Sequence, residues 1–316
     1  MISFRRNFFF ITVWLVASCQ HTDANHNDRG TGGSETYKIG LHPESGSKYQ
    51  YEIENETSFV AEVEGKEADN VTKTNALIRY TVSKDSIGNF LFAMNYDKIS
   101  LYTKKGDIEN DLNGDKGTAA IDPVEKMLAL LKTATITTRV TPSGKVIAVD
   151  GYKELGTKMF EGVHNGDPEM KNALQQQWEK LAGESIIQKN LDQFFSIFPD
   201  SAVHIGNTWE QSSIQAGELP MTIHTTYKLK SVNNDVAVIV ADGRVVNKGN
   251  ASGMMGYSNV EVKLEGTQAG FFEIHPATGM LLKAEIKSKV KGELNMIGRV
   301  VPVSIKSSIS INGKKI

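Results

Sequence analysis

Alternating apolar and polar residues dominate the chain after residue 34. In "SKYQYEIE", Tyr49, Tyr51 and Ile53 fall on one face of an extended segment, while the residues between them are charged or amidated. A period of two is typical of antiparallel strands that bury one face and expose the other. The same period recurs at 76–82, 90–96, 223–229, 260–264, 282–286 and 303–311. We therefore expect a curved antiparallel sheet with one solvent-exposed face.

Short turn sequences separate these segments. The stretches "SKDSIGN", "TPSGK", "VNNDV", "HPATGM" and "NMIGR" combine glycine, proline, asparagine or aspartate between apolar runs. Such combinations are typical of β-hairpin connections. Neighbouring strands are therefore predicted to pair as hairpins.

The period changes to a helical one in the middle of the chain. Asp122 has the position of a helix N-cap, Pro123 that of the first helical residue, and Glu125 that of a side chain reaching back to the cap. Apolar stripes predict further helices within 166–181 and 184–198, and a weaker one within 152–163. These helices are expected to cover one face of the sheet.

A weak repeat flanks the helical stretch. On each side a Gly-x-aromatic strand is followed by a tyrosine-bearing strand entering a hairpin and then by a proline-containing glycine turn. The predicted fold class is α+β and β-dominated, with two similar β modules and a helical segment between them that packs on the sheet. The expected divisions are a signal peptide at 1–18, a tether at 19–34, a first β module at 35–120, a helical segment at 121–198 with an inserted hairpin at about 133–150, and a second β module at 199–316.

The first 34 residues have the layout of an export signal and a tether. Arg5 and Arg6 precede an apolar run at 8–16, which is shorter than the roughly 20 residues that a membrane helix needs. Residues 20–34 are rich in glycine, asparagine and other polar residues and predict a flexible coil. Cys19 is the single cysteine, so no intrachain disulfide can form.

The sequence Val16-Ala17-Ser18-Cys19 resembles the lipobox of bacterial lipoproteins. The resemblance implies cleavage before Cys19, a thioether from its sulfur to a diacylglyceryl group, and an acyl group such as palmitate on its amino group. Gln20, after the lipidated position, favours the outer membrane by the sorting rule of such lipoproteins. The membrane, reached through this anchor, is the first expected partner.

Charge excludes one class of partner. Removing Arg5 and Arg6 from the 35 basic side chains leaves 33, against 37 acidic ones. Proteins that bind nucleic acid concentrate basic residues on one face. The acidic balance therefore argues against nucleic acid.

Much of the remaining chain, from about Thr36 to Ile316, resembles a family of bacterial lipoproteins classed only as a domain of unknown function. The resemblance is most specific in "FFSIFPDSAVHIGNTWEQ", "LEGTQAGFFEIHPATGMLLKAEIKSKVKGELN" and the ending "VPVSIKSSISINGKKI". Methionine is less frequent here than in that family, with Met254 and Met255 the only adjacent pair. The resemblance implies an envelope location and a β-rich fold, and it supplies no catalytic residues.

The residue types and their spacing give little indication of catalysis. The seven histidines lack the helical spacing of a zinc site, and no Gly-x-Ser-x-Gly nucleophile elbow occurs. His224 lies in a predicted strand on the face opposite Ile223 and Tyr227, and so is expected at the surface. We therefore expect a protein that is not an enzyme and has no metal or other cofactor beyond its covalent lipid.

One acidic loop partly matches a calcium-binding template. In "DLNGDKGTAAID", Asp111, Asn113, Asp115 and Asp122 take positions one, three, five and twelve, but Lys116 occupies position six, where the sharp turn needs glycine. A solvated loop ahead of a capped helix is the favoured interpretation, and calcium is the alternative.

Apolar residues of the predicted strands and helices suggest a binding function. The hypothesis is an apolar ligand, such as an acyl chain or lipid, held between the sheet and the helices. Its candidate lining is Tyr49, Tyr51, Phe90, Phe92, Met94, Met159, Phe194, Phe198 and Tyr227. The competing interpretation is that these side chains simply form the core. The alternative function is a structural or protein-interaction module of the cell envelope, and a hydrolase is less favoured.

Overall fold

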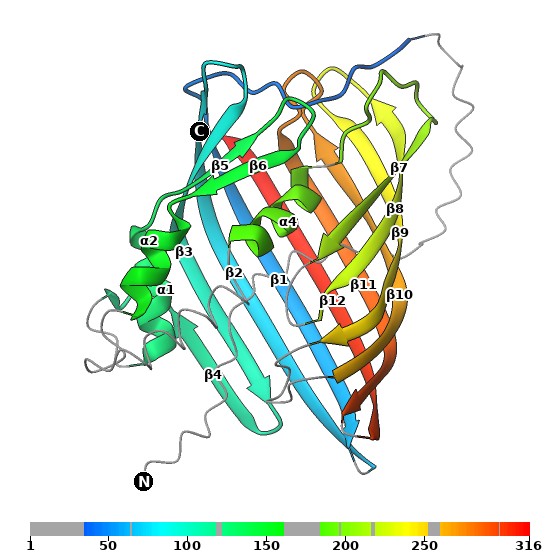
Figure 1. The fold of residues 1–316 in the computed structure, drawn as a ribbon. Coiled ribbons are helices and arrows are strands. Elements are labelled where there is room, and N and C mark those ends of the chain that lie inside the picture. Colours follow the sequence, from blue (N-terminus) through cyan, green and yellow to red (C-terminus); the bar gives the residue numbers. More distant parts are fainter. Residues whose placement is uncertain are drawn as a thin grey trace.

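The structure, a computed structural model, describes residues 35–63, 65–117, 122–160, 184–195, 197–215, 219–251, 260–296 and 298–316. The signal peptide, Cys19, the tether and the predicted helix at 166–181 lie outside these residues. The described part is dominated by one large antiparallel sheet with few helices, which confirms the predicted fold class (Figure 1).

Within the described residues the sheet has twelve strands. In the first half these are β1 (Lys48–Val63), β2 (Lys66–Lys84), β3 (Phe90–Lys105), β4 (Ile108–Asn113), β5 (Ile136–Val140) and β6 (Val146–Asp150). In the second half they are β7 (Thr208–Gln215), β8 (Met221–Val232), β9 (Ala237–Ala251), β10 (Val260–Ile274), β11 (Leu281–Met296) and β12 (Arg299–Lys315).

The strand order is β6-β5-β3-β2-β1-β12-β11-β10-β9-β8-β7, with β4 also paired to β3. The two halves join where β1 pairs with β12, for example at Ile53 opposite Ile311. The two predicted β modules therefore share one continuous sheet. The inserted hairpin, β5 with β6, pairs with β3 and so extends the first half.

The five turn sequences each connect two paired strands, as the hairpin prediction requires. Four of them, all except "VNNDV", contain a glycine with positive φ, because an L side chain resists that conformation. Gly144, with φ 88°, lies in the β5–β6 turn, and a Cβ there would meet the carbonyl oxygen of Phe195 at 2.2 Å. The turn therefore packs directly on Phe195, the last residue of helix α4 (Glu184–Phe195).

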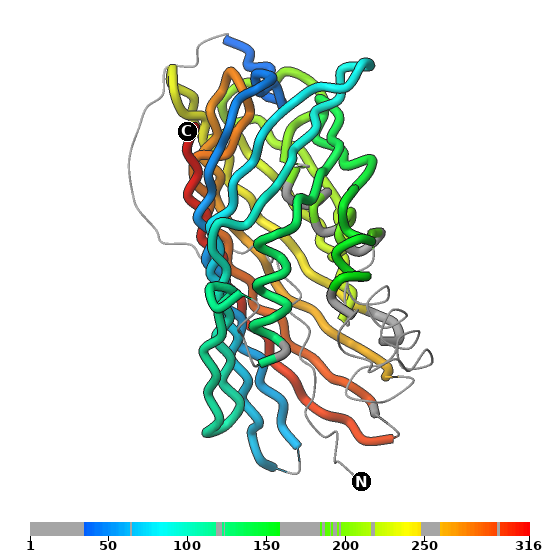
Figure 2. Tube along the Cα trace, turned by 90° about the vertical axis from the view of Figure 1, so that its left-hand side faces the viewer, coloured from blue at the N-terminus to red at the C-terminus, as the bar shows by residue number. Residues whose placement is uncertain are grey.

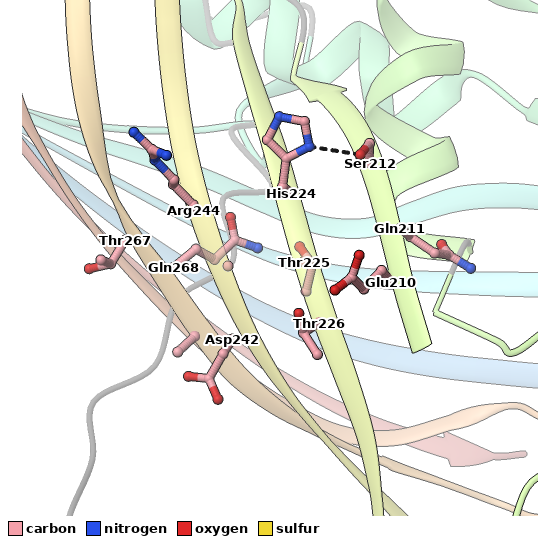
Figure 3. A pocket seen from close by; sticks show the side chains of 12 residues that line it. Glu210, Gln211, Ser212, His224, Thr225, Thr226, Asp242, Arg244, Thr267 and Gln268 are labelled. Atoms are coloured by element: carbon pink, nitrogen blue, oxygen red, sulfur yellow. Dashed lines mark hydrogen bonds between the residues drawn. The ribbon is translucent and has the colours of Figure 1, made fainter. Parts of the chain in front are cut away.

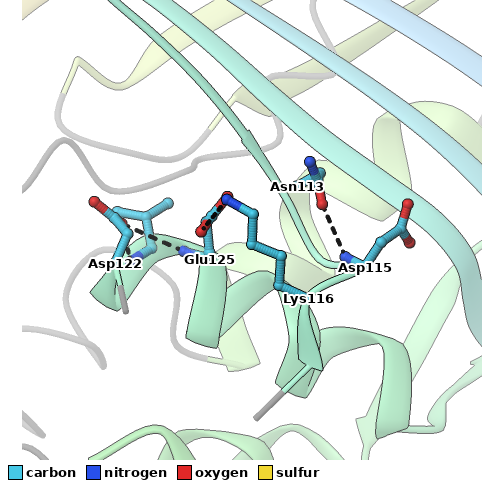
Figure 4. A network of polar contacts seen from close by, with 6 residues as sticks. Asn113, Asp115, Lys116, Asp122 and Glu125 are labelled. Atoms are coloured by element: carbon cyan, nitrogen blue, oxygen red, sulfur yellow. Dashed lines mark hydrogen bonds and ion pairs between the residues drawn. The ribbon is translucent and has the colours of Figure 1, made fainter. Parts of the chain in front are cut away.

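The described helices are α1 (Pro123–Thr133), α2 (Tyr152–Phe160) and α4 (Glu184–Phe195). Asp122 caps α1, accepting from the backbone N–H groups of Val124 and Glu125, which confirms the predicted cap. The predicted reach of Glu125 back to the cap is wrong. Its carboxylate is 5% exposed and pairs with Lys116 Nζ at 2.7 Å (Figure 4), because a buried carboxylate gains more from a cation than from a backbone N–H.

Helix α4 contacts both edge strands of the sheet, β6 and β7. On one side Gln188 Nε2 donates to the carbonyl oxygen of Val146 at 2.9 Å, and on the other Gln211 Nε2 donates to that of Phe198 at 2.9 Å. Edge strands carry unpaired backbone groups that need partners. The helix therefore covers both edges and ties the curved sheet together.

The segment before β1 crosses one end of the sheet, at the top of Figure 1 and, turned by 90°, of Figure 2. Tyr37 forms an antiparallel bridge with Val203, and His42 N donates to Thr278 O at 2.8 Å. Leu41 N donates to Pro142 O at 3.2 Å, and its side chain is buried. This end is thus closed by backbone hydrogen bonds from three separate regions.

No helix in the described ranges has the length and apolarity to cross a bilayer.

Candidate ligand-binding face of the sheet

The capped cluster is the apolar core at the end crossed by the N-terminal segment. It unites side chains from nearly all strands with Leu41 of that segment, Leu155 of α2 and Phe195 of α4. Aromatic rings lie in contact across it, including Phe92 with Phe195 at a centroid distance of 5.3 Å and Trp209 with Tyr227 at 5.8 Å. Sheet and helices therefore fill this region from both sides.

The structure brings most of the candidate lining residues together in the capped cluster. Six are buried there, and Met94 packs against them partly buried. The six are Tyr49, Tyr51, Phe90, Phe92, Phe198 and Tyr227. Met159 and Phe194 fall in α2 and α4, and their side chains lie outside the described residues. The close ring contacts give these residues a packing role, while a role in ligand binding stays a prediction.

Burial keeps the tyrosines of the inner face neutral. It raises the pKa of Tyr96 and of Tyr227 to about 12, with a hydrogen bond to Thr225 opposing the shift at Tyr227. It raises the pKa values of Tyr51 and Tyr80 further, and neighbouring tyrosines add to both shifts. The cause is the cost of a phenolate in an apolar surrounding. This region offers no anionic group at neutral pH from these side chains.

A second apolar region, the strand cluster, lies farther along the same face of the sheet. Its buried members are Ala61, Leu219, Met221, Ile223, Val245, Val260, Val262, Leu264, Val290, Leu294, Val301, Val303 and Ile305, with Phe59 packed against them. All belong to β1 and β8–β12 except Leu219, which directly precedes β8. None of its described members comes from a helix, and each buried member is at most 6% exposed, so the strand cluster is a buried aliphatic cluster built mainly by strands of one sheet.

A row of uncharged polar residues separates the two clusters. Each residue lies directly opposite the next in the strand register, across ten neighbouring strands. This polar row consists of Gln211, Thr225, Gly243, Gln268, Ser288, Ser307, Thr57, Thr72, Thr103 and Asn110. Thr225, Gln268, Ser288 and Ser307 are each at most 5% exposed. Buried polar groups are thus aligned across the centre of the inner face.

On β8 to β12 the neighbouring rows on both sides are apolar, whereas on β1 and β2 the row on the capped-cluster side continues with the buried polar residues Asn55 and Thr74. On the side of the capped cluster lie Tyr227, Ala241, Gly270, Ile286 and Ile309, and on the side of the strand cluster Ile223, Val245, Gly266, Val290 and Ile305. A one-residue register slip would turn every one of these side chains to the outer face, so the paired hairpins fix the row as a unit.

The polar row meets a hollow at Gly243. A cavity of about 490 Å³ is lined by twelve residues of β7–β10, among them Thr225, Gly243 and Gln268 of the row (Figure 3). A Cβ on Gly243 would lie 3.2 Å from Gln268 Cβ and 3.3 Å from Thr225 Oγ1. A side chain at this position would be crowded, so glycine allows Gln268 and Thr225 to lie close to β9.

The rest of the hollow is lined by exposed side chains of the outer face. Ser212 Oγ and His224 Nδ1 are 2.8 Å apart, and Arg244 Nη2 lies 3.9 Å from Glu265 Oε2. His224 is exposed on the face opposite Ile223, as predicted. Within the described residues no hydrogen bond links the His224 ring to a carboxylate, so the serine and histidine do not form a triad.

The acidic loop is organised by ion pairs (Figure 4). Asp115 pairs with Lys132, Asp122 caps α1, and Asn113 Oδ1 accepts from Asp115 N at 3.1 Å. The positive φ falls on Gly117, at 56°, and Lys116 reaches Glu125. Among the described residues no group of three or more histidine, cysteine, aspartate or glutamate side chains could hold a metal ion.

Sequence reasoning did not identify the polar row. One signal was available, because Ser307 interrupts the apolar positions of "PVSIKSSISI" between Ile305 and Ile309, and Thr225 lies between Ile223 and Tyr227. The alignment of these interruptions across strands depends on the pairing register, which the sequence does not display.

Solved structures resemble the fold at low sequence identity. Lipovitellin, from a structure titled for its lipid–protein interactions, aligns with a TM-score of 0.50 and 11% identity, over 86% of this chain and 25% of that chain. An outer-membrane channel from Pseudomonas putida F1 aligns over 87% of this chain and 97% of that one, with a TM-score of 0.27 and 6% identity. The chain thus corresponds to about a quarter of lipovitellin. No curated protein matches.

A comparison of the sequence with family models identifies the family of the chain. The model of a family of unknown function, DUF6263, matches residues 87–281. This range runs from the β2–β3 turn to the start of β11 and contains the helices and most of the strands that carry the polar row. It covers more than half of the chain, and the protein is therefore a member of the DUF6263 family.

Proposed function

We propose that the protein is a lipoprotein of the cell envelope, anchored through Cys19, that binds an apolar ligand of the acyl-chain type on the strand cluster and catalyses no reaction. The observation that carries the proposal is the composition of this cluster. It is an aliphatic face whose described members all come from one sheet, with Leu219 beside it. Its buried members are at most 6% exposed, and an acyl chain packed among them would remove its own apolar surface from water.

Other features support the same function. Helices and aromatic rings pack in the capped cluster, whereas the strand cluster is aliphatic and its buried members are each at most 6% exposed, so a ligand there would lie among buried side chains. Lipovitellin, whose structure is titled for lipid–protein interactions, has a similar fold. Fold likeness alone does not establish function, so the argument rests on the apolar face.

Native mass spectrometry tests this proposal. Residues 20–316, produced without the leader and Cys19, carry no covalent lipid. The expected spectrum shows the polypeptide with an added lipid mass that is lost at higher collision energy. The purified protein is also expected to enhance the fluorescence of N-phenyl-1-naphthylamine, which reports apolar binding sites. Bare polypeptide that leaves the probe fluorescence unchanged would contradict ligand binding.

Localisation is tested separately. With Cys19→Ala the precursor is expected to lose lipidation and leave the membrane fraction. Radiolabelled palmitate incorporated into that variant as into the wild type would refute the anchor.

A second function rests on the outer face. Lys289 lies directly opposite Lys306, and along the same outer row Arg244, 69% exposed, lies opposite Thr267, which pairs with Lys289. Like charges facing each other destabilise a sheet, and an anionic envelope polymer would relieve their repulsion. On a dextran sulfate column, Lys289→Gln with Lys306→Gln should elute at lower salt than Lys153→Gln with Lys158→Gln, which likewise removes two positive charges, from exposed positions on α2. Equal elution would exclude this surface.

A further inference from the structure

We infer that the polar row binds the uncharged polar group of an amphiphile, such as a glycerol ester, whose acyl chain lies along the strand cluster. This inference rests on the proposed function and specifies the chemistry of its ligand. It is argued from buried polar atoms, from their small neighbours and from the absence of charge among the ten row residues.

Two buried polar atoms in the centre of the row have no hydrogen-bond partner among the described residues. They are Gln268 Oε1, in a residue 4% exposed, and Ser288 Oγ, in a residue 3% exposed. The two residues lie directly opposite each other on β10 and β11. A buried polar group without a partner costs about 1 to 3 kcal/mol, so nearly all such groups in proteins are satisfied. A ligand with donor and acceptor groups would satisfy both.

The neighbours of Gln268 on the inner face are glycine and serine residues. Along β10 the adjacent positions on the same face are Gly266 and Gly270, and across the sheet Gln268 lies opposite Gly243 and Ser288. None of these four residues has a large side chain. The hollow of Figure 3 is lined mostly by outer-face residues, Thr267 among them, so it is not the space in which an inner-face ligand would lie. Gly266 and Gly270 also permit close backbone approach, since a Cβ there would meet carbonyl oxygens at 2.1 and 2.7 Å.

The row selects a neutral group. Apart from Gly243, its members are threonine, serine, glutamine and asparagine, whose side chains donate and accept hydrogen bonds without charge. A carboxylate or phosphate buried there would lack a cation, and the burial of an unpaired charge is far more costly than that of a hydrogen-bonded ester or hydroxyl. The apolar row on the strand-cluster side begins directly next to Gln268, at Gly266 and Val245, so a polar group at the row places its chain on aliphatic side chains.

Three probes separate this inference from the proposed function. Residues 20–316 are titrated with monoolein, oleate and hexadecane, each measured by displacement of N-phenyl-1-naphthylamine. The wild type is expected to bind monoolein more tightly than oleate. Gln268→Met, which keeps the size of the side chain and removes its hydrogen-bonding groups, should weaken monoolein binding about fivefold and leave hexadecane binding unchanged. Thr267→Val, at the adjacent position facing outward, should change neither.

The outcomes are distinct. If all three probes bind and Gln268→Met leaves the ratio of monoolein to hexadecane affinity unchanged, the polar row does not bind the ligand, although the proposed function stands. Tighter binding of oleate than of monoolein would likewise overturn the inference. If no probe binds, the proposed function itself fails. Ser288→Ala should also lower the ratio of monoolein to hexadecane affinity, by a smaller factor than Gln268→Met. It replaces Gln268→Met if that variant does not fold.

Discussion

The capped cluster and the strand cluster lie on the same face of one sheet, and they differ in what contacts them. The capped cluster packs against α2, α4 and the N-terminal segment, and its aromatic rings contact one another. The described members of the strand cluster are aliphatic residues of the sheet and Leu219. One face of a single sheet thus carries two buried apolar clusters, one packed against helices and the N-terminal segment and the other formed by aliphatic strand residues, with a row of polar residues and glycine between them.

Leucine truncation should separate the two regions most strongly. Leu229 in the capped cluster and Leu294 in the strand cluster are each 0% exposed and lie on strands of the same sheet. Leu229→Ala should lower the free energy of unfolding by about 3 to 5 kcal/mol, because the packed surroundings cannot close the cavity. Leu294→Ala should lower it by about 2 kcal/mol or less and weaken binding of N-phenyl-1-naphthylamine.

Urea unfolding and probe titration measure these two effects. Equal losses of stability, with unchanged probe binding by Leu294→Ala, would show that both clusters are ordinary core.

Alkaline pH should destabilise the capped region. Burial raises the pKa of Tyr227 to about 12 in the folded chain, while the unfolded value is about 10. Above pH 10 the folded state therefore binds more protons than the unfolded state. The stabilisation is complete below pH 10 and is lost as the pH rises through 12, by about 1.4 kcal/mol per pH unit for this residue. Tyr227→Phe should flatten that part of the pH profile of unfolding, and an unchanged slope would refute the burial of this hydroxyl.

Removing either hydrogen bond between the segment of α4 and an edge strand should have the smallest effect on the free energy of unfolding. Gln188→Ala and Gln211→Ala each remove a hydrogen bond that ties the segment of α4 to one edge strand. Each change should cost about 1 kcal/mol and speed amide exchange in α4 and β7 more than in β11. Lys189→Ala, at an exposed position on the same helix, is the control. Exchange that rises equally in β11 would mean that α4 does not close the sheet locally.

Much of the fold could be predicted from local sequence. Tyr49, Tyr51 and Ile53 alternate as their strand requires, the five turn sequences form hairpins, and Asp122 caps α1. Glu125 could not be assigned, because its partner Lys116 comes from a loop whose path depends on tertiary packing. The joining of both halves through β1 and β12 also depends on contacts between residues far apart in the sequence.

The candidate site could be predicted only in part. The aromatic residues that the sequence singles out, such as Phe92 and Tyr227, belong to the capped cluster because large rings are what a packed core uses. Gln268 and Ser288 look like ordinary polar strand residues until the register places them opposite each other. The polar row is a property of aligned strands, and single-strand patterns do not contain it.

The division of the inner face into a packed region and a binding region is tested most directly by methyl NMR. In residues 20–316 with labelled methyl groups, titration with monoolein should shift the signals of Val290 and Leu294 in the strand cluster and give contacts between them and acyl-chain protons. The signals of Leu229 and Ile239 in the capped cluster should stay unchanged. Shifts confined to Leu229 and Ile239, or no shift at either cluster under saturating monoolein, would contradict the division proposed for this sheet.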